Sequence, residues 1–263
     1  QAHVKVKPLA EDINLKVIAE RTPGFSGADL YSLMNEAAIL AAKDERKKVA
    51  QFDLIRSIEK VMLGPERKSH ILSPKEKKIT AYHEAGHALV ASCLPDADPV
   101  HKISIISRGN AGGYTLKLPL DERRLMSRSA FLDDIAMSLG GYVAEKEIFG
   151  DITTGPSNDL QVATYMARQM VTKYGMSTLG PIALESDSDQ FRGLYGKEYS
   201  EVYGEKIDDE VKRIMDDAWN RARLIIIDRR AALTAIAEEL MKVESIERDE
   251  FDKLLLVHGI APK

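Results

Sequence analysis

The chain has 263 residues, 44% of them hydrophobic and 30% charged, which is the composition of an ordinary globular protein. Its 37 Lys and Arg residues nearly balance 41 Asp and Glu residues, so the formal net charge of −4 gives no reason to expect a nucleic-acid partner. The single cysteine, Cys93, excludes an internal disulfide framework, and no run of 18 apolar residues that could span a bilayer occurs. We therefore expect this part of the chain to be soluble.

Residues 1–64 predict a small helical domain. Apolar side chains at helical spacing predict three helices, at 12–21, 27–46 and 51–63. Ser26, with Asp29 three residues later, is typical of the capping that starts a helix, here the second one. The segment 64–72 begins with Gly-Pro and is largely polar, which is typical of a linker, so the chain divides into domains at 1–64 and 65–263.

The second domain is predicted to be mainly helical, with one short region of strand. Ser73, Pro74 and Glu76 form a capping-box pattern with proline at the first helical position, and this helix should continue to about Leu94. Residues 100–115 contain alternating apolar and polar side chains and a glycine-rich stretch, which predicts a β-hairpin. Further helices are expected at 127–149, 158–174, 205–228, 230–243 and 246–257. The predicted fold class is therefore mostly α.

The first helix of this second domain contains the sequence His-Glu-Ala-Gly-His at 83–87. Because His83 and His87 are four residues apart, both imidazoles lie on one helix face, one turn apart, where they can bind one ion. Imidazole nitrogen is a favoured ligand of zinc, and a peptidase site keeps one coordination position for water. Glu84 lies next to the first ligand and can take a proton from that water as general base. Two histidines can also be ordinary core or surface residues, but their position inside a capped helix favours zinc.

The third zinc ligand has to come from another part of the chain. A histidine six residues after the second one, as in metzincins, is excluded because that position is Cys93. Glu145 and Asp159 are the acidic candidates, and their spacing alone leaves them nearly equal. A loop rich in Thr, Gly and Pro that ends in an acid favours Asp159, and Glu145 is then expected to orient a histidine. The ordinary alternatives are a first-turn acid stabilised by the helix dipole for Asp159 and an exposed helix acid for Glu145.

Several further segments follow the pattern of one known family. They are 24–30 (Gly-Phe-Ser-Gly-Ala-Asp-Leu), 35–38, 98–102, 153–160, 174–177 and 179–184. Together with the zinc motif, they make nearly the whole chain resemble the FtsH family, the membrane-anchored, ATP-dependent zinc proteases of bacteria, mitochondria and chloroplasts. The resemblance implies His83, His87 and Asp159 as ligands of one zinc ion per subunit, with Glu84 as the catalytic base of a zinc metalloendopeptidase.

The resemblance also implies roles for the rest of both domains. Residues 1–64 look like the helical lid of an AAA ATPase module, in which Gly27 and Ala28 would contact nucleotide. ATP and Mg²⁺ are expected only in the complete protein, because this chain contains no phosphate-binding Gly-x-x-x-x-Gly-Lys-Ser/Thr motif, and the chain alone is expected not to hydrolyse ATP. In the peptidase domain, an edge strand would pair with the substrate backbone. The residues assigned to this substrate contact are Ile103, Ile105, Gly113 and Thr115.

The same family implies a ring of six identical subunits whose peptidase sites face an enclosed chamber. Its substrates would be unfolded or misassembled membrane proteins and selected soluble proteins, with no nucleic acid involved. The membrane would be reached only through a segment upstream of this chain. The expected location is a bacterial inner membrane, with this portion on the cytoplasmic side, and the alternative is a mitochondrial or chloroplast membrane.

Three positions depart from the usual family pattern, and none of them is a metal ligand. They are Tyr142, where arginine is common, Pro156, where alanine is common, and Gly112, where leucine is common. Two other functions are open: a ring-forming module with a vestigial zinc motif, and a zinc hydrolase that acts on small amides. The intact motif argues against the first, since a degenerate site would lose Glu84 early, and the match outside the motif argues against the second.

Overall fold

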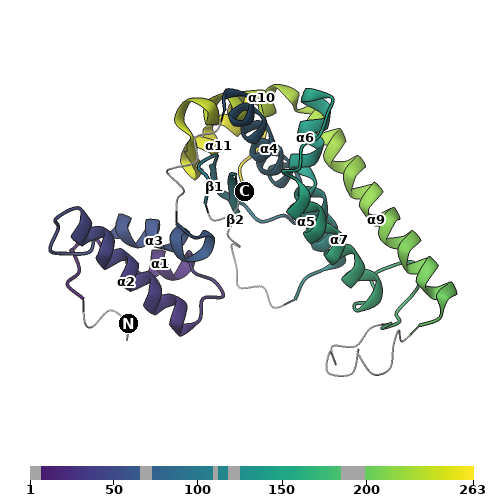
Figure 1. The fold of residues 1–263 in the computed structure, drawn as a ribbon, viewed down its shortest axis with the longest axis horizontal. Coiled ribbons are helices and arrows are strands. Elements are labelled where there is room, and N and C mark those ends of the chain that lie inside the picture. Colours follow the sequence, from purple (N-terminus) through teal and green to yellow (C-terminus); the bar gives the residue numbers. More distant parts are fainter. Residues whose placement is uncertain (1–6, 66–72, 109–111, 118–124, 185–198) are drawn as a thin grey trace. The chain divides into compact units, whose positions relative to one another are not determined.

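The computed structural model describes residues 7–65, 73–108, 112–117, 125–184 and 199–263 (Figure 1). By its internal contacts the chain divides into two compact units, one formed by Gln1–Ile71 with Ile106–Gly112 and one formed by Leu72–Ile105 with Gly113–Lys263. Within the described ranges, no helix is both long enough and apolar enough to cross a bilayer. The architecture is mostly α, as predicted.

The first unit is a cluster of three helices, α1 (Leu15–Glu20), α2 (Gly27–Lys43) and α3 (Gln51–Leu63). The predicted capping box starts α2: Ser26 Oγ accepts from the Asp29 N–H at 3.2 Å, and Asp29 Oδ2 accepts from the Ser26 N–H at 2.8 Å. The core of this unit comes from apolar residues of all three helices, namely Ile18, Leu33, Met34, Ala37, Ala41, Leu54 and Ile58, together with Val49.

The segment Ile106–Gly112 belongs to the first unit, although the sequence division at 64/65 assigned it to the second. A buried ion pair helps to explain why this segment belongs to the first unit. Arg108 Nη2 donates to Glu59 Oε2 at 2.9 Å, and the two side chains are only 7% and 6% exposed. Arg108 Nη1 also donates to the Gly64 carbonyl at 3.4 Å. Taking an unpaired guanidinium out of water is costly, so this pair fixes the segment on α3.

The second unit is built around one helix, α4 (Pro74–Cys93). The predicted capping box of Ser73 and Glu76 begins it, and Pro74 occupies the first turn. The helices that follow are α5 (Arg128–Ser138), α6 (Gly140–Phe149), α7 (Ser157–Thr172), α9 (Glu201–Asp228), α10 (Arg230–Val243) and α11 (Arg248–Val257). Helices α5, α6, α9 and α10 all pack on α4, so its residues 81–91 are buried, while the long α9 also runs beside α7 (Figure 1).

One predicted helix is divided in the structure. The sequence predicted a single helix over 127–149, whereas α5 ends at Ser138 and α6 begins at Gly140, with Leu139 between them. Two consecutive glycines, Gly140 and Gly141, follow the break, and glycine lowers the cost of departing from regular helix geometry.

The second unit also contains a three-stranded antiparallel sheet in the order β2-β1-β3. The strands are β1 (Val100–Ser104), β2 (Tyr114–Lys117) and β3 (Ser245–Glu247). The predicted hairpin pairing is present, with Ile103 opposite Thr115, while the centre of its turn, 109–111, lies outside the described residues. The sequence analysis did not predict β3, which pairs Ile246 with Ile103 and takes the start of the helix expected at 246–257. Strand β1 is therefore central, and the edge strand expected over 103–115 is β2 alone.

The backbones of α4 and α6 approach each other closely at a pair of glycines. An ideal Cβ added to Gly86 would lie 2.4 Å from the Gly140 carbonyl oxygen, and one added to Gly140 would lie 2.7 Å from the Gly86 carbonyl oxygen. Both distances are far below van der Waals contact, and the colliding atoms belong to backbone that cannot rotate away. Only glycine at both positions permits this crossing.

We therefore expect Gly86→Ala to lower the free energy of unfolding by about 1–3 kcal/mol, the usual cost of forcing an extra methyl group into a packed core. The matched control is Gly204→Ala in α9, where the added Cβ would meet only the Tyr199 ring at 3.5 Å. That substitution should raise stability by about 0.5–1 kcal/mol, because alanine favours helix over glycine. Denaturant unfolding of both variants measures the difference, and equal effects would contradict the proposed close approach.

Candidate metal centre

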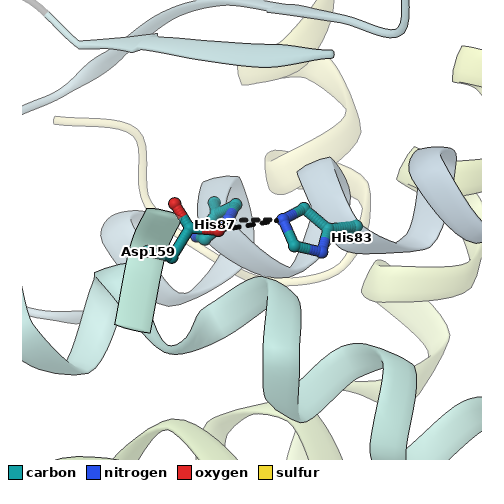
Figure 2. Close-up of side chains that lie close together, drawn as sticks. All are labelled: His83, His87 and Asp159. Atoms are coloured by element: carbon teal, nitrogen blue, oxygen red, sulfur yellow. Dashed lines mark hydrogen bonds and ion pairs between the residues drawn. The ribbon is translucent and has the colours of Figure 1, made fainter. Parts of the chain in front are cut away.

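Three potential metal ligands come together from two helices, α4 and α7 (Figure 2). The Nε2 atoms of His83 and His87 are 3.0 Å apart. Asp159 Oδ2 lies 3.2 Å from the Nε2 atom of His83 and 3.5 Å from that of His87. Among the described residues, this is the group of His, Cys, Asp or Glu side chains whose ligand atoms are close enough to hold one ion.

The spacing of these three atoms fits zinc. Zinc in proteins is tetrahedral, with bonds of roughly 2.0–2.1 Å to nitrogen and 2.0–2.2 Å to oxygen, which places neighbouring ligand atoms about 3.3–3.5 Å apart. The three separations observed here, 3.0, 3.2 and 3.5 Å, lie around that value. Two imidazoles and one carboxylate are also a ligand set that zinc hydrolases use, with a fourth position left for water or substrate.

The other ring nitrogen of each histidine has a fixed partner. His87 Nδ1 lies 2.8 Å from the Met137 carbonyl oxygen, at the end of α5. A carbonyl can only accept, so Nδ1 of His87 carries a proton and donates it, and Nε2 is the ring nitrogen left to face a ligand. His83 Nδ1 lies 2.8 Å from Glu145 Oε1, a carboxylate that favours the same tautomer. Both rings are therefore held with Nε2 toward Asp159.

Glu145 connects the histidine to the loop that leads into α7. Its side chain is 2% exposed, and its second oxygen, Oε2, accepts from the Thr153 N–H at 2.8 Å. Thr153 Oγ1 in turn accepts from the Gly155 N–H at 3.1 Å, four residues before Asp159. One buried carboxylate thus orients His83 and also fixes the backbone that positions Asp159. The sequence analysis predicted that Glu145 orients a histidine, and its contact with His83 supports that role, which stays a prediction.

The charges of the site favour a bound cation. Burial raises the pKa of Asp159, but hydrogen bonds from His83 and His87 outweigh it and hold that pKa well below its usual range. The pKa of Glu145 is also lowered, because hydrogen bonds from His83 and the Thr153 backbone outweigh burial. Burial lowers the pKa of His83, yet hydrogen bonds to Asp159 and Glu145 raise it to about 10, so zinc would have to displace a proton from this ring before Nε2 could bind it. Two anionic carboxylates therefore surround the imidazoles.

Glu84 lies between the two histidines in sequence and is buried as they are. Burial raises the pKa of its carboxyl group, although the neighbouring histidines and a hydrogen bond from Thr115 act in the opposite direction. A carboxylate with a raised pKa is a stronger base than one at its ordinary value. Position and environment both suit the proton transfer expected of Glu84.

A glycine leaves the space in which the ligands converge. An ideal Cβ on Gly141 would lie 2.5 Å from Nε2 of His83 and 2.6 Å from Nε2 of His87, so any side chain there would collide with both ring nitrogens. The sequence analysis missed this role of Gly141, and with it the helix-packing role of Gly86 and Gly140. The glycines themselves were a usable sequence signal. Glycine inside a helix costs about 1 kcal/mol relative to alanine, so its presence there indicates a packing or functional role.

The predicted substrate residues do not all lie in one place. Ile103 and Ile105 are 0% and 3% exposed, and β1, which carries Ile103, is paired on both sides. Their side chains belong to the core, so the expected contact of these two residues with substrate is not supported. Gly113 and Thr115 lie beside Glu84 instead.

The residues predicted to contact nucleotide lie in the first unit. Gly27 and Ala28 begin α2 and are exposed, directly after the capping residue Ser26. Their contact with nucleotide stays a prediction.

A helix that carries His83, Glu84 and His87, with a carboxylate from a second helix, defines the class of zinc metallopeptidases. The model of Peptidase family M41 matches residues 70–254, and that of the AAA+ lid domain matches residues 12–54. The chain belongs to peptidase family M41.

Similar proteins include the ATP-dependent zinc metalloprotease FtsH of Thermotoga maritima, which is 49% identical over 97% of this chain and 43% of its own length. The proteins of the same name from Veillonella parvula and Rubrobacter xylanophilus are 47% and 45% identical, over 97% and 99% of this chain. This chain spans 40–43% of the length of these three relatives. The FtsH family and the class of zinc metalloendopeptidase predicted from the sequence are thereby confirmed.

We expect Glu145→Gln to weaken zinc binding by about 10–100-fold, the usual effect of losing a residue that orients a metal ligand. The amide oxygen can still accept from His83, but the amide nitrogen cannot accept from the Thr153 N–H, and the negative charge is lost. Competition with a chromophoric chelator measures the affinity.

The matched control is Glu147→Gln on the same helix, since Glu147 Oε1 accepts from Arg223 Nε at 2.7 Å and makes no contact with the histidines. Zinc affinity should be unchanged in this variant. An equal loss in both variants would mean that general charge, and not the orientation of His83, controls affinity.

Proposed function

We propose that this chain is the zinc endopeptidase portion of an ATP-dependent protease that hydrolyses peptide bonds of unfolded or extracted membrane and soluble proteins. The convergence of His83, His87 and Asp159 beside the buried Glu84 is the observation that carries this proposal. Membership of peptidase family M41 supports the same reaction.

One zinc ion per subunit would be held by Nε2 of His83, Nε2 of His87 and Oδ2 of Asp159. When bound, zinc supplies Lewis-acid chemistry, which polarises a peptide carbonyl and makes a water molecule more acidic at neutral pH. The two contacts on the far side of the imidazoles, from Glu145 and the Met137 carbonyl, would hold the ligand atoms in place.

Glu84 would be the general base and then the general acid. Its carboxylate takes a proton from the attacking water and later gives that proton to the leaving amine of the cleaved peptide bond. This role requires a carboxyl group that both accepts and returns a proton near neutral pH. Burial raises the pKa of Glu84, which shifts this carboxyl group in the required direction and supports the role.

Substrate would bind by adding a strand to β2. Within the described part of the chain, β2 pairs only with β1, so its outer edge can form backbone hydrogen bonds with an extended peptide. Gly113 and Thr115 place this edge directly beside Glu84. Only an extended, unfolded chain can pair in this way, which agrees with unfolded proteins as substrates.

The whole protein is proposed to couple this peptidase to ATP. The printed names of the relatives describe ATP-dependent proteases, and residues 12–54 match an AAA+ lid. In the complete protein Gly27 and Ala28 would contact nucleotide with Mg²⁺. Six copies would form a ring, anchored by an upstream segment in a bacterial inner membrane with this portion on the cytoplasmic side, or alternatively in a mitochondrial or chloroplast membrane.

We expect the zinc-loaded chain to cleave casein, an unfolded protein, and a chelator to abolish that cleavage. Glu84→Gln should lower kcat by about 10²–10⁴-fold while zinc stays bound, because the variant keeps the ligands and removes only the proton acceptor. Steady-state cleavage assays and elemental analysis measure the two quantities on the same sample.

Asp159→Asn should instead lose zinc as well as activity, because a neutral amide is a much poorer ligand than a carboxylate. The control is Asp151→Asn, an exposed acid in the loop before α7. Zinc binding without any casein cleavage would favour a non-catalytic module, and cleavage of small amides alone would favour a different zinc hydrolase.

A further inference from the structure

The carboxylate of Glu84 is held by a strand as well as by its own helix. Thr115 Oγ1, on β2, donates to Glu84 Oε2 at 2.8 Å and lies 3.3 Å from the backbone oxygen of the same residue. Glu84 is 6% exposed, so this hydroxyl replaces contacts with water that the carboxylate would otherwise make. Hydrogen bonds to a charged acceptor are stronger than neutral ones, and this one fixes the end of a flexible side chain.

The second oxygen of the same carboxylate lies against Gly113, which comes directly before β2. An ideal Cβ on Gly113 would be 2.8 Å from Glu84 Oε1 and 2.9 Å from Glu84 Cγ. It would also be 2.8 Å from the Ser104 backbone oxygen on β1. The absence of a side chain at Gly113 therefore leaves room for the Glu84 carboxylate, with Oε1 beside Gly113 and Oε2 on Thr115.

The geometry of a strand allows Thr115 to hold Glu84 without blocking the edge of the sheet. Side chains stand roughly perpendicular to the sheet, whereas backbone N–H and C=O groups point along its plane. The Thr115 side chain can thus donate to Glu84 while the outer backbone edge of β2 stays available to a peptide. Threonine is also restricted at χ1, which makes its hydroxyl a well-defined donor.

We propose that Thr115 is a positioning residue for the general base, and that β2 sets the Glu84 carboxylate in register with the peptide strand that it binds. This inference rests on the proposed roles of Glu84 and of the β2 edge. It assigns Thr115 a function different from the direct substrate contact expected from the sequence. Proton transfer requires the base to lie within hydrogen-bond reach of the water, so loss of this anchor lowers the rate of the chemical step.

The test compares Thr115→Val, which keeps the shape and removes the donor, with Thr115→Ser, which keeps the hydroxyl. In the zinc-loaded chain with a fluorogenic peptide, Thr115→Val should lower kcat about tenfold and leave KM within about twofold. Thr115→Ser should recover most of the lost kcat. Zinc affinity, measured by chelator competition, should be the same in both variants and in the unchanged chain.

Two kinetic results would overturn the proposal. A raised KM with unchanged kcat would make Thr115 a direct substrate contact, and equal losses of kcat in the valine and serine variants would show that the hydroxyl has no role. If Thr115→Val lowers the melting temperature, the same comparison is made between Thr115→Ala and Thr115→Ser, well below the melting temperature of both.

The Glu84→Gln variant distinguishes a failure of this inference from a failure of the proposed function on which it rests. If Glu84→Gln stays active, the assignment of the base fails, and the role of Thr115 fails with it. If Glu84→Gln is inactive while Thr115→Val retains full kcat, only the positioning role of Thr115 is wrong.

Discussion

The site depends on how closely α6 can approach α4. Glycine at 86 and 140 lets the two backbones touch, and the next residue, Gly141, then lies directly beneath both imidazoles. A helix pair at ordinary separation would leave a void or a side chain where the ligand atoms converge. The candidate metal site thus depends on missing side chains as much as on His83, His87 and Asp159, and the loss of helix propensity at three glycines is the cost.

Around this crossing, each residue of the candidate site on α4 is held from two sides. His83 is held by its helix and by Glu145, His87 by its helix and by the Met137 carbonyl, and Glu84 by its helix and by Thr115. These partners come from α6, from the end of α5 and from β2. Because these partners come from several elements, the geometry of the site is set by the packing of the whole unit and not by α4 alone.

Much of this could be predicted from local sequence signals. The capping residues around Ser73 predicted the start of α4, and the spacing of the histidines predicted a metal-binding face on it, because both are properties of neighbouring residues. Which acid would meet the Nε2 atoms could not be decided by spacing, since Glu145 and Asp159 are both distant in sequence. Likewise, β3 could not be predicted, because it is only three residues long, has no strand pattern in its sequence and pairs with β1 from far along the chain. Without β3, the strand that carries Ile103 was expected at the edge of the sheet.

The segment Ile106–Gly112 has a practical consequence for dissecting the molecule. Because it belongs to the first unit while β1 and β2 belong to the second, the backbone passes from one unit to the other at three points, after residues 71, 105 and 112. A truncation that begins at residue 72 would keep Arg108 and discard Glu59, which leaves a guanidinium without the carboxylate that compensates its burial. Isolating the peptidase therefore calls for a second alteration, a redesigned turn between β1 and β2, as well as a new N-terminus.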